Sequence, residues 1–189
     1  MPPLDQARVG EVLDAVLSLV PESTYRLVGT ASCVLRGIDM PAGDIDVLFA
    51  DRETIDAWVT ALSATMTVLD APAWFGDAQQ YLARLVTEGV TVELSTVEIE
   101  ADTDTSECVG SGPWEHFDLV PSGATVVPAV ALELRLVTEI SRQRADRFEP
   151  LIGYFRRHPC DLDLVERGLA AHATPQGDIA RLIAHLSNT

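Results

Sequence analysis

The chain has 189 residues, 47% of them hydrophobic, which is enough for one large domain with a substantial core. It carries 29 acidic and 13 basic residues, all of the basic ones arginine, so the formal net charge is −16. Such an acidic surface disfavours a broad nucleic-acid interface. No apolar run approaches the roughly 20 residues of a membrane span, and the N-terminus lacks the pattern of a secretory signal, so we expect a cytoplasmic protein without a membrane partner.

The first third of the chain alternates between helical and extended patterns. Apolar residues at helical spacing end at Pro21, Thr30 is placed to cap a short helix, and Asp51 is placed to cap a longer one. The patterns predict a helix over 4–20, a strand over 25–29, a short helix over 30–38, a strand over 44–50 and a helix over 52–66.

The remainder of the chain begins with an ambiguous segment, 67–80, and ends in helices. Residues 81–99 read as a hairpin that turns at Glu88 and Gly89, residues 100–115 as an acidic surface loop, and residues 116–130 as a second pairing of strands. Helices are predicted over 130–143, 147–157, 161–172 and 177–187. The sequence thus predicts an α+β fold with a core at 1–128 and a helical C-terminal subdomain, packed on that core, at 129–189.

Two carboxylates in the strand 44–50 are the first chemical signal. Asp44 and Asp46 stand at positions i and i+2, so they share one face of the strand, while Ile45 and Val47 face the core. Paired carboxylates repel each other, and they are the hard oxygen ligands that Mg²⁺ prefers. Glu93, on the polar face of another predicted strand, is the candidate for a third metal ligand.

A second signal lies upstream of the carboxylates. Gly29 ends the strand 25–29 and allows a ligand to approach the backbone closely, and a helix is predicted to follow it. Thr30 and Ser32 add hydroxyl donors, so Gly29, Thr30 and Ser32 form a candidate phosphate cradle. A phosphate cradle followed by metal-binding carboxylates indicates phosphoryl or nucleotidyl transfer.

This combination resembles the nucleotidyltransferase superfamily with the polymerase-β-like fold. The stretches "LVGTASCVLRG" and "GDIDVLF" are similar to those of its small bacterial members, which include antibiotic-modifying enzymes, and "VPAVALELRLVTEI" is loosely similar to the helix after their catalytic core. The resemblance implies a Mg²⁺-dependent enzyme that moves a nucleoside monophosphate from a nucleoside triphosphate, with ATP expected, to a hydroxyl of an acceptor. It implies that Asp44, Asp46 and Glu93 hold metal and that Gly29, Thr30 and Ser32 hold phosphates.

The sequence departs from the family pattern at two places. The third carboxylate is usually aspartate and here is Glu93, which is one methylene longer. The later basic motif often includes lysine, for which only Arg142 or Arg144 could stand in. The roles of Arg36 and Trp114, the oligomeric state and the acceptor stay open, although an acidic pocket would suit a cationic small molecule such as an aminoglycoside.

Two other functions remain compatible with these residues. One is a non-catalytic or regulatory relative, for example one component of a toxin–antitoxin pair, that keeps the fold without turnover. The other is a sugar-nucleotide enzyme that uses Asp44 and Asp46 as a metal clamp, but that function leaves Gly29 and Thr30 unexplained.

Overall fold

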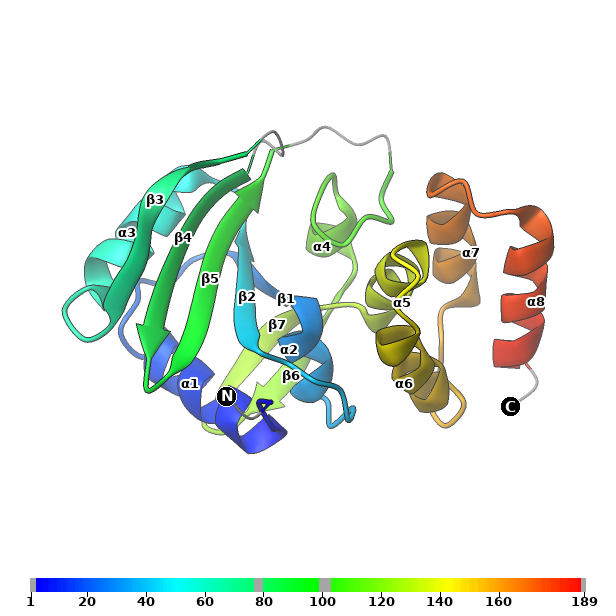
Figure 1. Ribbon diagram of the computed structural model, residues 1–189, viewed down its shortest axis with the longest axis horizontal. Helices are drawn as coiled ribbons and strands as arrows, with labels where there is room; N and C mark the ends of the chain where they lie inside the picture. The colour runs from blue at the N-terminus through cyan, green and yellow to red at the C-terminus, as the bar shows by residue number, and fades with distance from the viewer. Residues whose placement is uncertain (1–2, 77–79, 99–102, 188–189) are drawn as a thin grey trace.

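The computed structural model describes residues 3–76, 80–98 and 103–187. Seven strands form one mixed sheet in the order β3-β4-β5-β2-β1-β7-β6 (Figure 1). The strands are β1 (Tyr25–Val28), β2 (Asp44–Phe49), β3 (Thr67–Phe75), β4 (Gln80–Thr87), β5 (Val90–Val97), β6 (Phe117–Ser122) and β7 (Thr125–Val130). Parallel pairing of β2 with β5 and of β1 with β7 is combined with antiparallel hairpins at both edges.

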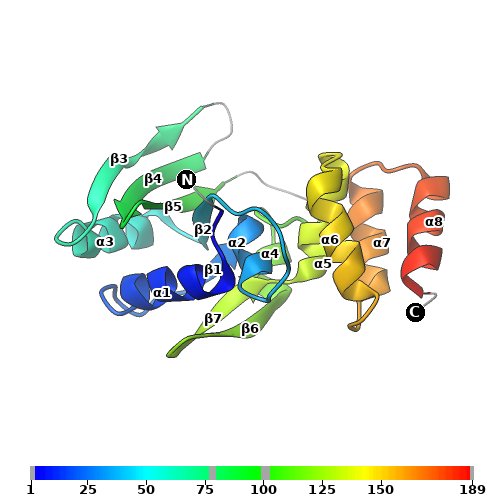
Figure 2. The ribbon, with the colours of Figure 1, turned by 60° about the horizontal axis from the view of Figure 1, so that its bottom comes forward.

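Two helices cover one face of the sheet, α1 (Gln6–Leu17) and α3 (Arg52–Leu62) (Figure 2). Each begins at an aspartate whose side chain accepts a backbone N–H of the first turn: Asp5 from Arg8 and Asp51 from Thr54, both at 2.8 Å. Trp58 on α3 is fully buried, packs edge-on against Phe49 of β2 and donates its indole N–H to Ser23. The main core therefore lies between these helices and the sheet.

In Figure 1, the helices of the C-terminal part lie on the side of the sheet that is away from β3. They are α5 (Leu132–Ser141), α6 (Ala145–Phe155), α7 (Leu162–Ala171) and α8 (Gln176–Ser187). A second apolar cluster, made of Val28, Leu48, Val130, Leu134 and Leu164, joins α5 and α7 to the sheet. The predicted division between residues 128 and 129 falls within β7, which ends at Val130.

The segments that the sequence described correctly are those with strong local signals. The hairpin β4–β5 turns at Glu88 and Gly89, whose φ angles of 47° and 81° lie in the left-handed region. The four C-terminal helices and the helices α1 and α3 lie where apolar periodicity predicted them. Among the described residues, no helix combines the length and the apolar character needed to cross a membrane.

Three expectations need correction or completion. The short helix α2 (Gly29–Val34) begins after Val28 without a side-chain cap, so Thr30 is not its N-cap. The ambiguous segment contains the edge strand β3. The predicted surface loop is partly buried at Thr105 and Glu107 and ends in a short helix, α4 (Gly112–Glu115), while its residues 100–102 lie outside the described part. The charged side chain of Glu107 can be buried because it has hydrogen-bond partners inside the protein.

Candidate active site

Three carboxylates share the sheet face that lies opposite α1 and α3, called here the site face. Asp46 of β2 is paired in register with Glu93 of β5, so their side chains leave neighbouring strands in the same direction, and Asp44 lies two residues before Asp46 on that face. Asp44 is exposed, whereas Asp46 and Glu93 are partly buried. Ile45 and Val47 are buried on the other face, as the alternation of β2 predicted.

The charges of these three residues are poorly compensated. Burial, followed by the negative charges of Asp44, Glu93 and Glu107, raises the pKa of Asp46 to about 7. Burial and the charge of Asp44 also raise the pKa of Glu93. A stable protein retains such a group of like charges most readily where it binds a cation.

The carboxylates do not yet form a closed ligand set. Within the part of the chain that the structure describes, one group of three candidate ligands has all its ligand atoms within 4.8 Å of one another: Asp104, Glu115 and His116. Asp104 already pairs with His116 and with Arg167, at 3.2 Å each, so its charge is compensated. The candidate ligand atoms of Asp44, Asp46 and Glu93 do not all lie within this distance of one another.

Gly29 joins the carboxylates and the predicted phosphate cradle into one site. It follows β1 directly as the first residue of α2 and has a φ of +66°, a conformation that glycine adopts without strain. A Cβ atom at this position would lie 2.8 Å from Cγ of Asp46 and would overlap its carboxylate. Only glycine lets the turn and the metal-binding candidate Asp46 pack this closely.

The two hydroxyl residues of the cradle are differently placed from what their sequence positions suggested. Ser32 is fully buried, and its hydroxyl donates to the carbonyl of Gly29 at 2.8 Å. Thr30 is also buried, with 5% of its surface exposed. The Ser32 side chain thus stabilises the turn from inside, and its role as a phosphate donor stays a prediction.

A buried chain of ion pairs links this turn to the C-terminal helices. The N–H of Gly29 donates to Glu107 at 3.0 Å, and Arg135 of α5 donates to the other oxygen of Glu107 at 2.6 Å. Arg135 also pairs with Glu139, which lies 3.6 Å from a guanidinium nitrogen of Arg147. Glu107, Arg135 and Glu139 are each at most 3% exposed, so two helices and a loop position the turn through charged contacts.

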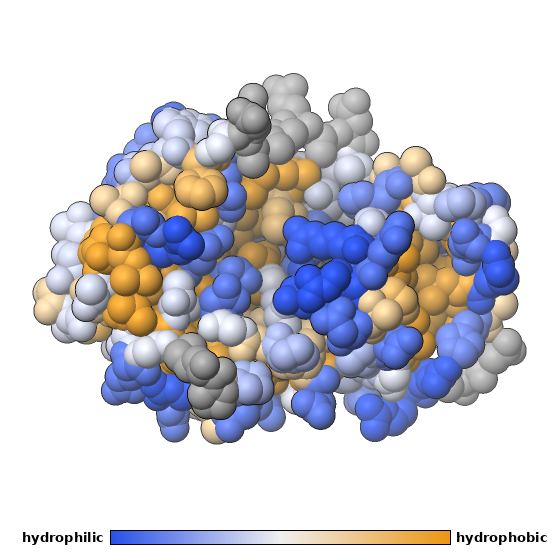
Figure 3. All heavy atoms as spheres, viewed as in Figure 1, coloured by the Kyte–Doolittle hydropathy of each residue, from blue (hydrophilic) through white to orange (hydrophobic). Residues whose placement is uncertain are grey.

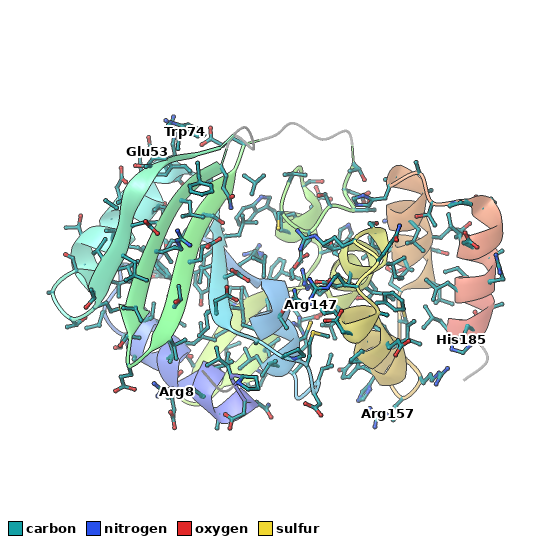
Figure 4. The ribbon with its side chains drawn as sticks, viewed as in Figure 1. Arg8, Glu53, Trp74, Arg147, Arg157 and His185 are labelled. Carbon is teal, nitrogen blue, oxygen red and sulfur yellow. The ribbon has the colours of Figure 1, made fainter. Side chains whose placement is uncertain are left out.

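Arginines gather where α5 meets α6. Figure 3 shows strongly hydrophilic side chains over this part of the molecule, and in Figure 4 Arg147 extends from the helices toward the sheet. Burial and the positive charges of Arg144, Arg135 and Arg142 lower the pKa of Arg147. Arg144 forms an ion pair with Asp146 at 3.1 Å, while the ion pairs of the described residues include none with Arg142. Mutually repelling cations of this kind favour an anionic ligand.

The structure gives Arg36 and Trp114 contacts within the protein. Arg36 pairs with Asp118 at 2.8 Å and donates to three backbone carbonyls, which is a structural set of contacts. Trp114 packs on the second apolar cluster, and the Arg26 guanidinium lies 5.1 Å from its ring centroid.

Sequence patterns missed Glu107, Arg135, Glu139 and Arg147. Each lies far along the chain from Gly29, and no local periodicity reports an ion pair between a loop and a helix. The opposite charges of Arg135 and Glu139, four residues apart within a helix pattern that is otherwise mostly apolar, are the signal that could have suggested their mutual pairing.

Comparison with solved structures identifies the fold. A candidate nucleotidyltransferase from Thermotoga maritima aligns with a TM-score of 0.57 and 16% identity, over 82% of this chain and 98% of that one. An antigenic nucleotidyltransferase-like protein from Paracoccidioides brasiliensis aligns with a TM-score of 0.50 and 17% identity, over 97% and 95% of the two chains. No protein-family model and no curated protein matches the sequence. The chain therefore has the nucleotidyltransferase fold, an α+β fold, as the sequence predicted.

Proposed function

We propose that this protein is a metal-dependent nucleotidyltransferase that moves a nucleoside monophosphate from a nucleoside triphosphate, with ATP the expected donor, to a hydroxyl of an acceptor. The observation that carries the proposal is the direct packing of Asp46 against Gly29, with Glu93 in register on the next strand. It joins a candidate metal site to a candidate phosphate site within a fold shared with nucleotidyltransferase-like proteins.

The residues present fit Mg²⁺. Asp44, Asp46 and Glu93 offer hard oxygen ligands, and burial together with the neighbouring negative charges raises the pKa of Asp46. These three residues would hold the ion, which supplies charge stabilisation to a transferring phosphoryl group. The same three residues are those that the sequence singled out.

The rest of the site would bind and orient the triphosphate. Thr30 and Ser32, the candidate phosphate residues, would lie beside the metal candidates because Asp46 packs directly against Gly29. Arg142 and Arg144 would meet the outer phosphates from the helical side, because guanidinium groups bind phosphate through several N–H donors. Glu107 and Arg135 would keep the turn in its orientation.

The proposed reaction is a displacement at the α-phosphorus of the nucleoside triphosphate. The acceptor oxygen forms a bond to the α-phosphorus, the bond to the pyrophosphate oxygen breaks, and the acceptor proton passes to a base. Glu93 would serve as that base or orient the acceptor hydroxyl, since its pKa is raised above the ordinary value. The net charge of −16 favours a cationic acceptor, and an aminoglycoside-like amino sugar is the first class to assay.

The test is pyrophosphate release with Mg²⁺, ATP and a panel of hydroxyl acceptors. Asp46→Asn and Glu93→Gln are expected to reduce turnover by on the order of 10²-fold or more, the scale for removing a positioned acid–base group. Asp56→Asn is the matched control, because Asp56 lies on α3 and accepts a hydrogen bond from Tyr81 away from the site. Equal turnover in Glu93→Gln and wild type would show that Glu93 has been misassigned.

A non-catalytic relative is the second candidate. It is favoured by one observation: the candidate ligand atoms of Asp44, Asp46 and Glu93 do not all lie within 4.8 Å of one another. This candidate predicts that Mg²⁺ with ATP raises the melting temperature while no acceptor supports pyrophosphate release. Release with any acceptor excludes it.

A further inference from the structure

A row of four charged residues crosses the site face from strand to strand. Asp70 of β3 is paired in register with Arg84 of β4, Arg84 with Glu93 of β5, and Glu93 with Asp46 of β2. The order of charges is therefore negative, positive, negative, negative. Two of the proposed metal ligands, Glu93 and Asp46, form one end of this row.

Arg84 has two carboxylates within reach on opposite sides. Residues paired across neighbouring antiparallel strands have Cβ atoms about 4.5–5.5 Å apart, so Glu93 is as near in register as Asp70. Yet Nε of Arg84 donates to Asp70 at 2.5 Å, and the ion pairs of the described residues include none between Arg84 and Glu93. The guanidinium is therefore bonded to Asp70 on β3, and its charge acts on Glu93 only from a distance, where it partly opposes the rise in the pKa of that carboxyl.

An irregularity in β3 places Asp70 where it can hold Arg84. Val68 is paired with Leu85, so regular antiparallel pairing would set Leu69 opposite Arg84. The register instead shifts between Val68 and Asp70, and again between Asp70 and Ala73, which brings Asp70 opposite Arg84 and leaves Leu69 54% exposed. Bulges commonly re-aim a side chain beside a functional site.

We propose that Asp70 is a positioning residue that holds the Arg84 guanidinium away from Glu93, so that Glu93 remains available to a divalent cation. The proposal rests on the assignment of Glu93 as a metal ligand under the proposed function. Without Asp70, Arg84 pairs with the carboxylate directly opposite, and a cation then has to displace a guanidinium from Glu93. Asp70 thus keeps the third ligand open from a distance of two strands.

A simpler role for Asp70 would be to add negative charge near the site. Both roles predict weaker cation binding when Asp70 is neutralised. They differ when Arg84 is also removed: a positioning residue then has nothing to position, whereas a charge acting through space keeps its effect.

The experiment measures binding of Mn²⁺ alone, by the electron paramagnetic resonance signal of the free ion, in wild type, Asp70→Asn, Arg84→Gln and the double variant. We expect Asp70→Asn to weaken binding about 10-fold or more, the scale for losing a residue that orients a ligand. We expect the double variant to bind within about 2-fold of Arg84→Gln, since no guanidinium is left to occupy Glu93. Asp56→Asn, which removes the same charge on the α3 side, controls for net charge.

The positioning role would be overturned if Asp70→Asn weakened Mn²⁺ binding equally in the wild-type and the Arg84→Gln background. It would also be overturned if Asp70→Asn left Mn²⁺ binding unchanged. A second measurement does not depend on metal: a crystal structure of Asp70→Asn grown with a chelator. We expect Arg84 within hydrogen-bond distance of Glu93, and a guanidinium that stays away from Glu93 would overturn the inference. Failure of the proposed function is seen separately, as wild-type Mn²⁺ binding that Glu93→Gln does not weaken.

Discussion

Two groups of charged residues lie near each other in this molecule and differ in whether opposite charges are paired within the group. The buried chain Glu107, Arg135, Glu139 and Arg147 contains two negative and two positive side chains, each within reach of an opposite charge. Asp44, Asp46 and Glu93 on the strands are all negative, and the nearest register neighbour of the opposite sign, Arg84, is turned to Asp70.

The difference separates a structural role from a functional one. Charges that have an opposite charge close by inside the protein are compensated whether or not a ligand is present, so they fix the relative position of loop and helix. Charges that repel each other destabilise the empty protein and gain most when a cation binds. Carboxylates therefore stabilise the folded protein in the first group and destabilise it in the second. Substitutions in each group can test this difference.

The largest effect is expected for Arg135→Met. It leaves Glu107 and Glu139 buried without their shared partner, and breaking a buried pair in this way costs about 3–5 kcal/mol. The free energy of unfolding from urea titration measures the loss. The triple variant Arg135→Met, Glu107→Gln, Glu139→Gln is expected to recover much of it, because neutral amides no longer require a counter-ion. No recovery would mean that Arg135 acts through its packing and not through its charge.

Asp46→Asn is expected to change stability in the opposite direction. In the presence of a chelator it removes a buried, repelled charge, which should stabilise the protein by roughly 2–4 kcal/mol at pH 8. Because the folded-state pKa is raised, the wild type loses stability as pH rises from the ordinary value of 3.8 toward about 7, and the variant should lack this slope. Urea titrations at several pH values measure both. A variant less stable than wild type at pH 8 would contradict the proposed repulsion.

Gly29→Ala tests the contact between the turn and the carboxylates. The left-handed φ of +66° and the overlap with Asp46 should together cost about 1–2 kcal/mol and weaken Mn²⁺ binding, since the carboxylate has to move. Gly37→Ala is the matched control: Gly37 has a φ of +76°, but its Cβ would have only Gln6 Oε1 nearby, at 3.6 Å. The control should show a comparable backbone strain with unchanged Mn²⁺ binding. Equal binding losses in both variants would count against a specific contact.

The smallest effect concerns Asp14, a carboxylate with partners. It accepts the N–H of Ala124 at 3.0 Å and the hydroxyl of Thr125 at 2.7 Å, and these bonds lower its pKa below the ordinary 3.8. Its stabilising contribution is present above the unfolded-state value and is lost as pH falls through the lower folded-state value. Asp14→Asn should therefore be less stable than wild type near pH 6, and the difference should shrink below pH 4. A constant difference across this range would show that the charge of Asp14 is irrelevant.

Local patterns in the sequence determined the parts of the site that depend on a few neighbouring residues. Alternation along 44–50 put Asp44 and Asp46 on one face and Ile45 and Val47 on the other, and alternation along 90–95 put Glu93 on a polar face. The glycine after β1 is identified from the sequence as a position of close backbone approach to a ligand, which stays a prediction; the structure shows Asp46 packed against it. These inferences succeed because side-chain direction in a strand follows from position alone.

The tertiary structure decided which of these faces meet and which charges are paired. The segment 67–80 could not be assigned from sequence because two register shifts break the alternation of β3, and the same shifts bring Asp70 opposite Arg84. In the sequence, Glu107 is one more acid in an acidic loop; in the structure, Arg135 of α5 and the N–H of Gly29, the first residue of α2, both bind it. Pairing across more than 25 residues depends on how elements pack, and packing is determined by the whole core, so no local pattern contains it.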